Sequence, residues 1–237
     1  PLTAIAFFML TGELMTSATI TDRLVALSRA LIGRIRGGLA QVNVLVSMFF
    51  AGMNGSVVAD TATVGALVLP AMKKAGYPAA FSAAVTGVSS TIGGIIPPSI
   101  MMIVLANATE ISIAALFAAG IIPGILIGVV IMVINHYFAV KYNFERSDQP
   151  FSVRRAGKEL YRSSFALLIP LVLVGSVMGG VASVVEAGAI TALVALFTGV
   201  FVYRTIKWKD CTGAFRRAFR NSAMVFIIIA ASGPFSW

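Results

Sequence analysis

The residues most capable of chemistry lie in two short interruptions of apolar sequence. The first is a Gly-Met-Asn-Gly-Ser run at 52–56, followed by Asp60, and the second is a Ser-Ser-Thr-Ile-Gly-Gly run at 89–94, followed by Pro97 and Pro98. Hydrocarbon offers no hydrogen-bond partner, so interrupted backbone at membrane depth persists only where it packs inside protein or lines a wet cavity. Two interruptions so close together therefore predict a binding site.

Opposed helix ends supply the expected chemistry. A helix that begins after Gly55 and Ser56 presents unsatisfied N–H groups, which favour an anion. The last carbonyls of a half-helix over 79–92 favour a cation, and a second half-helix begins at Ser99. Hydroxyl oxygens are hard, neutral ligands that suit sodium. We predict sodium ligands at Asn54, Gly55, Ser56, Ser89, Ser90, Thr91 and Gly93, and contacts to an acidic substrate at Ser56, Asp60, Thr61, Pro97, Pro98 and Ser99.

Each of these residues also has a purely structural interpretation. Asp60 could only complement the dipole of its own helix, and hydroxyls in membrane helices commonly donate to a preceding carbonyl. For Glu13 and Glu186 we expect hydrogen bonds between helices rather than a proton relay. An intramembrane serine hydrolase would need Ser56 paired with a base. The single histidine, His136, is instead expected near the cytoplasmic surface, so no enzyme activity is predicted.

Composition identifies the class of protein. Hydrophobic residues make up 58% of the 237 residues and charged residues 11%, and the mean hydropathy is +0.94. These values predict an all-α, polytopic integral membrane protein embedded in a lipid bilayer. The net charge of +9 does not indicate nucleic-acid binding, because the basic residues lie between apolar segments. One cysteine, Cys211, and one histidine exclude a disulfide framework and a Cys/His metal cluster within this chain.

Segment lengths predict how the chain is organised. Residues 38–51 and 57–72 are each too short to cross a bilayer, which favours a re-entrant hairpin over one kinked crossing. Residues 20–36 have apolar positions at three- and four-residue steps, typical of an amphipathic surface helix, with an ordinary connector as the alternative. We also predict a discontinuous helix over 79–106 and crossings over 112–140, 163–181 and 184–203. The apolar ends at 1–16 and 221–237 are each too short to cross a bilayer, which indicates an internal fragment of a longer protein.

The distribution of charge supports the hairpin. If the hairpin returns to its own side, every lysine and arginine falls on one face of the membrane, which the positive-inside rule makes cytoplasmic. The opposite face, at 107–111 and 179–183, then has none. The predicted cytoplasmic segments are 23–36, 73–74, 141–162 and 204–220.

Several short motifs resemble one family of membrane proteins. They are Gly-Glu-Leu-Met at 12–15, Arg-Gly-Gly-Leu-Ala at 36–40, Ala-Asp-Thr-Ala at 59–62, Leu-Pro-Ala-Met-Lys-Lys at 69–74, Ser-Ser-Thr-Ile-Gly at 89–93 and Ile-Pro-Pro-Ser at 96–99. Together they are similar to the large membrane subunit (DctM- and SiaM-like permeases) of tripartite ATP-independent periplasmic (TRAP) transporters. Two departures are Gly94, where members often have proline, and 182–186, where Ala-Ser-Val-Val-Glu replaces a frequent Thr-Pro-Thr-Glu run.

This resemblance implies a function and partners. It implies sodium-coupled import of small organic acids, such as C4-dicarboxylates or sialic acids, by an elevator mechanism in the bacterial inner membrane. A small membrane subunit and a periplasmic substrate-binding protein are implied partners, and sodium is the only implied ion, with no cofactor. The alternative is a structural subunit or passive channel.

The resemblance also implies a division of the chain. Residues 1–37 would hold the end of a transmembrane helix and an amphipathic cytoplasmic arm. Residues 38–106 would hold the hairpin and broken helix of a transport domain, which form the first of two inverted repeats. Residues 107–237 would hold further transmembrane helices with basic cytoplasmic loops and the start of the second repeat.

Overall fold

All regular secondary structure is helical in residues 2–33, 35–144 and 152–232, the parts of the chain that the computed structural model describes. This confirms the predicted all-α fold. In chain order the elements are α1 (Thr3–Ser17), α2 (Ile20–Ile32), α3 (Gly38–Asn54), α4 (Val57–Lys74), α5 (Ala79–Ser90), the 3-10 turn η1 (Thr91–Gly94), α6 (Ile100–Thr109), α7 (Ile113–Lys141), α8 (Val153–Met178), α9 (Val184–Phe197), the π-helical turn η2 (Thr198–Val202) and α10 (Trp208–Ser232).

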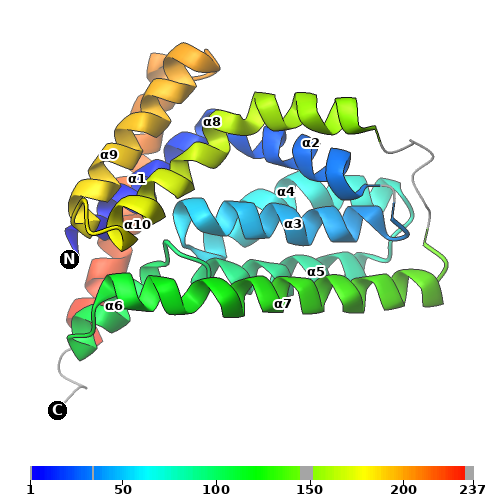
Figure 1. The fold of residues 1–237 in the computed structure, drawn as a ribbon, viewed down its shortest axis with the longest axis horizontal. Helices are drawn as coiled ribbons and strands as arrows, with labels where there is room; N and C mark the ends of the chain where they lie inside the picture. Colours follow the sequence, from blue (N-terminus) through cyan, green and yellow to red (C-terminus); the bar gives the residue numbers. More distant parts are fainter. Residues whose placement is uncertain (1, 34, 145–151, 233–237) are drawn as a thin grey trace.

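Helices α3 and α4 form a hairpin of two short helices. They contain 17 and 18 residues, and they pack against each other and against α5 (Figure 1). α3 ends at Asn54 because Gly55 adopts the left-handed conformation, with φ +60°. α4 begins after Ser56, whose Oγ accepts a hydrogen bond from the Ala59 N–H at 3.3 Å. Residues 38–72 are therefore not one continuous rod.

The next helical segment is interrupted, as its sequence predicts. α5 passes into η1, the chain turns through 95–99, and α6 starts at Ile100. Long helix α7 runs beside this interruption (Figure 1). A Cβ at Gly120 of α7 would overlap the carbonyl oxygen of Ile95, and one at Gly124 would overlap the Ile96 side chain. Two glycines of α7 thus create the space that the turn occupies.

Within the described residues, three helices are long and apolar enough to cross a membrane by length and composition: α7, α8 and the continuous 184–202 segment. A fourth is possible if α1 and α2, which meet at 71°, count as one bent span. Large apolar side chains are exposed along α7, including Ile122 at 76% and Val133 at 64%. Such a surface is typical of contact with lipid or another apolar partner.

Helix α2 is the predicted amphipathic segment, and it packs on α3 and α8. Ile20, Leu24 and Leu27 are buried, whereas Leu31 and Ile35 are each 41% exposed. At its start, the Arg23 guanidinium carbon lies 3.8 Å from the ring centroid of Tyr203. This cation–π contact attaches the arm to the segment that precedes α10.

Two predicted boundaries need correction. Residues 153–162 are not part of a loop, because α8 begins at Val153 and the Ser152 side chain caps it by accepting a hydrogen bond from the Arg155 N–H at 3.4 Å. The predicted cytoplasmic segment at 204–220 and the predicted apolar end at 221–237 are not separate elements, because α10 continues from Trp208 to Ser232. Parts of three predicted segments lie outside the described residues. They are Arg34 and residues 145–151, which were predicted to be cytoplasmic, and the last five residues of the predicted apolar end at 221–237.

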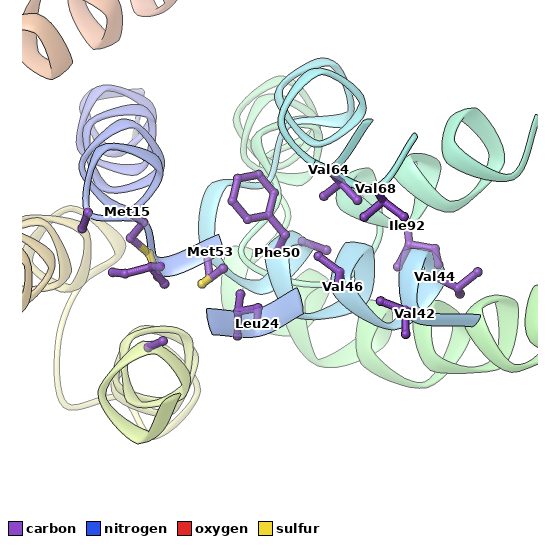
Figure 2. Close-up of a cluster of buried hydrophobic side chains, with 14 of the residues drawn as sticks. Met15, Leu24, Val42, Val44, Val46, Phe50, Met53, Val64, Val68 and Ile92 are labelled. Atoms are coloured by element: carbon purple, nitrogen blue, oxygen red, sulfur yellow. The ribbon is translucent and has the colours of Figure 1, made fainter. Parts of the chain in front are cut away.

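Two apolar clusters hold the helices together. The larger one brings α1, α2, the hairpin, α5 and η1 together with parts of α7, α8, α9 and α10, and Figure 2 shows Phe50, Met53, Val64 and Ile92 among its members. The smaller one joins α1 to α6, α7, α8 and α9 around Phe8, Ile103, Phe117 and Leu173. The hairpin and the broken helix therefore share one core, which fixes their relative positions.

Candidate functional site

The hairpin turn and the helix break meet directly. The Ile100 N–H donates to the Gly55 carbonyl oxygen at 3.3 Å. A Cβ at Gly55 would overlap the Pro98 carbonyl oxygen and lie 2.9 Å from the Ser99 Cα. Only glycine allows this approach, and only glycine adopts the required φ without strain. We call the contact between residues 54–56 and residues 93–100 the joint.

Further backbone contacts close the joint. The Gly93 position faces Ser56, because a Cβ on Gly93 would lie 3.6 Å from both the carbonyl carbon and oxygen of Ser56. The Asn54 Oδ1 accepts a hydrogen bond from the Ser56 N–H at 3.0 Å, which stabilises the turn. Gly12 of α1 packs against the Asn54 side chain. The interrupted backbone is therefore packed inside protein, as the sequence predicts.

Ser99 begins α6 and ties the break together. Its Oγ accepts a hydrogen bond from the Met102 N–H at 3.3 Å and donates one to the Gly94 carbonyl oxygen at 2.7 Å. The side chain is fully buried. One hydroxyl thus satisfies an orphan donor of α6 and a carbonyl at the end of η1.

A second set of polar side chains lies between α3 and α5. Asn43 Nδ2 donates to Thr86 Oγ1 at 2.7 Å, and Ser47 Oγ lies 3.2 Å from Ser89 Oγ. Ser89 Oγ also donates to the Thr86 carbonyl oxygen at 3.1 Å, and Ser90 Oγ donates to it at 2.8 Å. All five side chains are buried. We call Asn43, Ser47, Thr86, Ser89 and Ser90 the hydroxyl cluster.

Asp60 of α4 faces the hydroxyl cluster. Its side chain is 0% exposed, and the Ser90 and Ser47 hydroxyls lie beside it. Neither carboxylate oxygen has a hydrogen-bond partner within the described parts of the chain. The next residue, Thr61, is exposed and donates to the Val57 carbonyl oxygen at 2.9 Å. Asp60 thus faces the interior, whereas Thr61 lies on an exposed part of α4.

The predicted sodium ligands separate into three groups. Asn54, Gly55, Ser56 and Gly93 lie at the joint, whereas Ser89 and Ser90 belong to the hydroxyl cluster. Thr91 is exposed and donates to the Val88 carbonyl oxygen at 2.7 Å.

The predicted substrate contacts also differ in exposure. Pro97, Pro98 and Ser99 are buried at the joint, Ser56 is half-buried, Thr61 is exposed and Asp60 is enclosed. The assignment of ligands remains a prediction for both sets.

Sequence reasoning missed three members of the hydroxyl cluster: Asn43, Ser47 and Thr86. A signal was present, because Asn43 and Ser47 are four residues apart in an otherwise apolar segment and therefore share one helix face. Thr86 and Ser90 show the same spacing. Polar residues four positions apart within the predicted apolar helices, considered together with the two interruptions, would have indicated this cluster.

Other polar residues have structural roles. Glu13 bonds between helices, as predicted: its carboxylate accepts hydrogen bonds from Arg217 Nε at 2.6 Å and Asn221 Nδ2 at 3.1 Å. The expectation for Glu186 is wrong, because it forms a capping box with Ser183 within its own segment: the Ser183 N–H donates to Glu186 Oε2 at 2.7 Å and the Glu186 N–H donates to Ser183 Oγ at 3.3 Å.

The geometry disfavours a serine hydrolase. Ser56 lies at the joint, where Gly124 packs against Ile96. His136 is twelve residues further along α7, about 18 Å of helix away. The Ser56 hydroxyl is also occupied as the cap of α4.

The fold and the joint define an α-helical integral membrane protein with a helical hairpin packed on a broken helix. Comparison with known families identifies which one. Residues 1–237 match the tripartite ATP-independent periplasmic transporter, DctM component, and the chain belongs to this family. The resemblance expected from the short motifs is thereby confirmed.

Characterised relatives carry three different substrate names. The chain is 34% identical over 236 residues to the sialic acid TRAP transporter large permease protein SiaM of Vibrio cholerae, covering 100% of this chain and 55% of the relative. It is 36% identical over 229 residues to the C4-dicarboxylate TRAP transporter large permease protein DctM of Pseudomonas aeruginosa, covering 97% and 53%. It is 34% identical over 236 residues to the 2,3-diketo-L-gulonate TRAP transporter large permease protein YiaN of Escherichia coli, covering 100% and 55%. The chain spans about half the length of these relatives.

Proposed function

We propose that this chain is part of the large permease of a sodium-coupled TRAP transporter that imports a small organic acid across the bacterial inner membrane. The observation that carries this proposal is the joint. There, the end of α3 at Asn54 and the beginning of α4 after Ser56 meet the Pro98 carbonyl and the beginning of α6 after Ser99, from two separate interruptions of the chain. Opposed helix ends in a membrane are suited to hold an anion and a cation side by side.

The substrate class follows from the relatives and from chemistry. Sialic acid, C4-dicarboxylates and 2,3-diketo-L-gulonate, the compounds in the relatives' names, are organic acids. A carboxylate on such a substrate suits the N–H groups at the beginning of α4, where Ser56 is half-buried and Thr61 is exposed. We propose that sodium binds the oxygen atoms of the joint and cluster that the sequence singled out.

Coupling would require the hairpin and the broken helix to move together. α3, α4 and α5 pack against one another, and the hairpin meets the broken helix at the Gly55–Ile100 hydrogen bond, so they suit motion as a unit. α8 and α9 pack mainly on α1 and α2, which suit a stationary scaffold. We propose an elevator mechanism on this basis, with a small membrane subunit and a periplasmic substrate-binding protein as partners.

The test is transport by the full-length permease together with its small subunit and binding protein in proteoliposomes. Radiolabelled sialic acid, succinate and 2,3-diketogulonate would be offered separately, with an inward sodium gradient or with choline in place of sodium. We expect uptake of one acid only when the sodium gradient is present. Uptake that is equal in sodium and choline would contradict sodium coupling.

A matched pair of variants tests the joint itself. Ser56→Ala removes the cap and hydroxyl at the joint, and Thr109→Ala removes an exposed hydroxyl that donates to the Leu105 carbonyl oxygen at 2.7 Å. We expect Ser56→Ala to lower sodium-driven uptake at least tenfold and Thr109→Ala to change it less than twofold. Equal effects would contradict the placement of the site at the joint. A passive channel would instead equilibrate the acid without accumulating it.

A further inference from the structure

The first half of α10 has three sides with different properties. The side that packs on α1 includes Ala214 and Ala218, which are 0% and 4% exposed. Arg217 lies beside this side, where its guanidinium group donates hydrogen bonds to Glu13 and Ser17 of α1. These contacts fix the rotation of α10 about its own axis. They therefore determine which residues of the helix face away from the bundle.

Aromatic side chains form the second side, which we call the aromatic stripe. Its members are Trp208, Phe215 and Phe219, which are 83%, 49% and 78% exposed. Their spacings of seven and four residues place them on one face of the helix. An exposed apolar surface of this kind indicates contact with an apolar partner, and tryptophan is enriched where a membrane meets water.

Basic side chains form the third side, which we call the basic stripe. Its members are Lys209, Arg216 and Arg220, and all of them are exposed. Each directly follows a member of the aromatic stripe in the sequence, so the two stripes lie about 100° apart around the helix. From Trp208 to Arg220, cations and aromatic rings thus lie side by side along about 18 Å of the helix surface.

The charge of the basic stripe is not neutralised by the residues that the structure describes. Within them, no member of the stripe forms an ion pair. Asp210, the acidic residue next to Lys209, accepts a hydrogen bond from the Lys207 N–H at 3.0 Å at the beginning of α10. Arg217 differs, because its Nε lies 2.6 Å from a Glu13 carboxylate oxygen. A partner that supplies negative charge therefore suits the basic stripe.

We propose that the first half of α10 binds an anionic phospholipid, with the phosphate headgroup on the basic stripe and the acyl chains along the aromatic stripe. Guanidinium groups bind phosphate oxygens through paired hydrogen bonds, and basic residues at a membrane surface attract anionic lipids. A soluble anion would neutralise the basic stripe but leave Trp208 and Phe219 uncovered. A lipid with an anionic headgroup complements both stripes at once. This inference goes beyond the proposed function, because it depends neither on the transported acid nor on sodium.

Quenching of Trp208 fluorescence by lipids with brominated acyl chains tests this contact. The full-length permease with its small subunit is reconstituted into phosphatidylcholine vesicles that contain increasing fractions of brominated phosphatidylglycerol or brominated phosphatidylcholine. The Trp208 emission is the difference between wild type and Trp208→Phe. The test variant combines Arg216→Gln and Arg220→Gln, and the control combines Lys73→Gln and Lys74→Gln in α4, which has no aromatic residue. All four substituted positions are exposed, so both variants should fold.

We expect half-maximal quenching of Trp208 at a fraction of phosphatidylglycerol about threefold lower than the fraction of phosphatidylcholine, because only the first lipid has a net negative charge. The test variant should show equal quenching by the two lipids, and the control variant should keep the wild-type preference. Neither a substrate nor a sodium gradient is present, so the result is independent of the transport test.

Three results would overturn the proposal. Equal quenching of the wild type by both lipids would show that α10 contacts bulk lipid without selecting a headgroup. A lack of quenching by either lipid would show that protein covers the aromatic stripe in the full-length permease. Loss of the preference on addition of soluble glycerol phosphate would show that the basic stripe binds a free phosphate ester instead of a lipid.

Discussion

At the scale of single residues, Gly55 decides whether the hairpin and the broken helix can touch. Its φ is +60°, and a Cβ would overlap the Pro98 carbonyl oxygen. Gly76 has a similar φ of +80°, with nothing within 4 Å of a Cβ. Alanine substitutions at these two glycines therefore distinguish the loss of folding stability due to backbone conformation from the loss due to close approach.

We predict that Gly76→Ala costs about 1–2 kcal/mol of folding stability, from the left-handed conformation alone. Gly55→Ala should cost about 1–3 kcal/mol more, because the joint must open to accept the methyl group. Reversible unfolding of the detergent-solubilised protein measures both values. Equal costs for the two variants would show that the contact with Pro98 does not constrain the turn.

Ser99 offers a similar comparison. It caps α6, donates to the Gly94 carbonyl oxygen and is fully buried, whereas Ser112 caps α7 from an exposed position. Ser112→Ala should lower the folding stability by about 0.5–1 kcal/mol, the usual effect of removing an exposed helix cap. Ser99→Ala should cost about 2–3 kcal/mol, because it also leaves a buried carbonyl without its donor. The same unfolding measurement checks both, and a smaller loss for Ser99→Ala than for Ser112→Ala would contradict the buried hydrogen bond.

At the scale of elements, the break depends on the surface of α7. Gly120 of α7 packs against the Ile95 backbone and the Met102 side chain, whereas Gly175 of α8 has open space. Gly175→Ala should stabilise its helix by up to about 1 kcal/mol through helix propensity. Gly120→Ala should destabilise the protein by about 1–3 kcal/mol, because its methyl group meets backbone. Stabilisation by both substitutions would show that the turn at 95–99 adapts freely.

Helices α1 and α10 are joined by a polar contact across the bundle. Arg217 Nε donates to Glu13 Oε2 at 2.6 Å, and Arg217 Nη2 donates to Ser17 Oγ at 3.0 Å. A double-mutant cycle with Glu13→Gln and Arg217→Gln should give a coupling energy of about 1–2 kcal/mol, because the Glu13 side chain is only 19% exposed. A coupling below about 0.3 kcal/mol would place this pair among surface contacts with no measurable effect.

At the scale of the whole molecule, the ends of several helices gather together. The end of α2, the α4–α5 turn and the beginning of α8 lie at one end of the bundle in Figure 1, and the α6–α7 connection lies at the other. The segment after α9 lies beside the start of α2, where Thr205 Oγ1 donates to the Ala18 carbonyl oxygen at 2.9 Å. The orientation inferred from the sequence, with every basic segment on the cytoplasmic side, stays a prediction.

Cysteine labelling tests that orientation. Cys211 is the single cysteine of this chain, so Cys211→Ser, together with replacement of any cysteine elsewhere in the full-length permease, provides a cysteine-free background. We predict that Lys74→Cys and Lys209→Cys react with an impermeant maleimide only from the cytoplasmic side, and that Thr109→Cys and Val181→Cys react only from the periplasmic side. All four positions are exposed, so accessibility within the protein does not limit the reaction. Labelling of Lys74→Cys from the periplasm would show that the hairpin crosses the membrane.

Local sequence features determined much of the architecture. Gly55, Ser56 and Ser99 mark where helices end and begin, because φ preferences and side-chain caps act within a few residues. The hairpin and the interruption at 91–99 were predictable for this reason. The beginnings of α8 and α10 were not, because polar residues that read as loop also form helices once a bundle supports their other faces.

The amino-acid sequence by itself determined that this is a helical membrane protein of the DctM family with two interruptions rich in small polar residues. Only the tertiary structure decided that Gly55 meets Pro98, that Thr61 faces outward, and that Asp60 is enclosed beside Ser47 and Ser90. The physical reason is the separation along the chain over which each interaction acts. Helical periodicity determines which residues share a face, but what that face meets depends on helices far away in the chain.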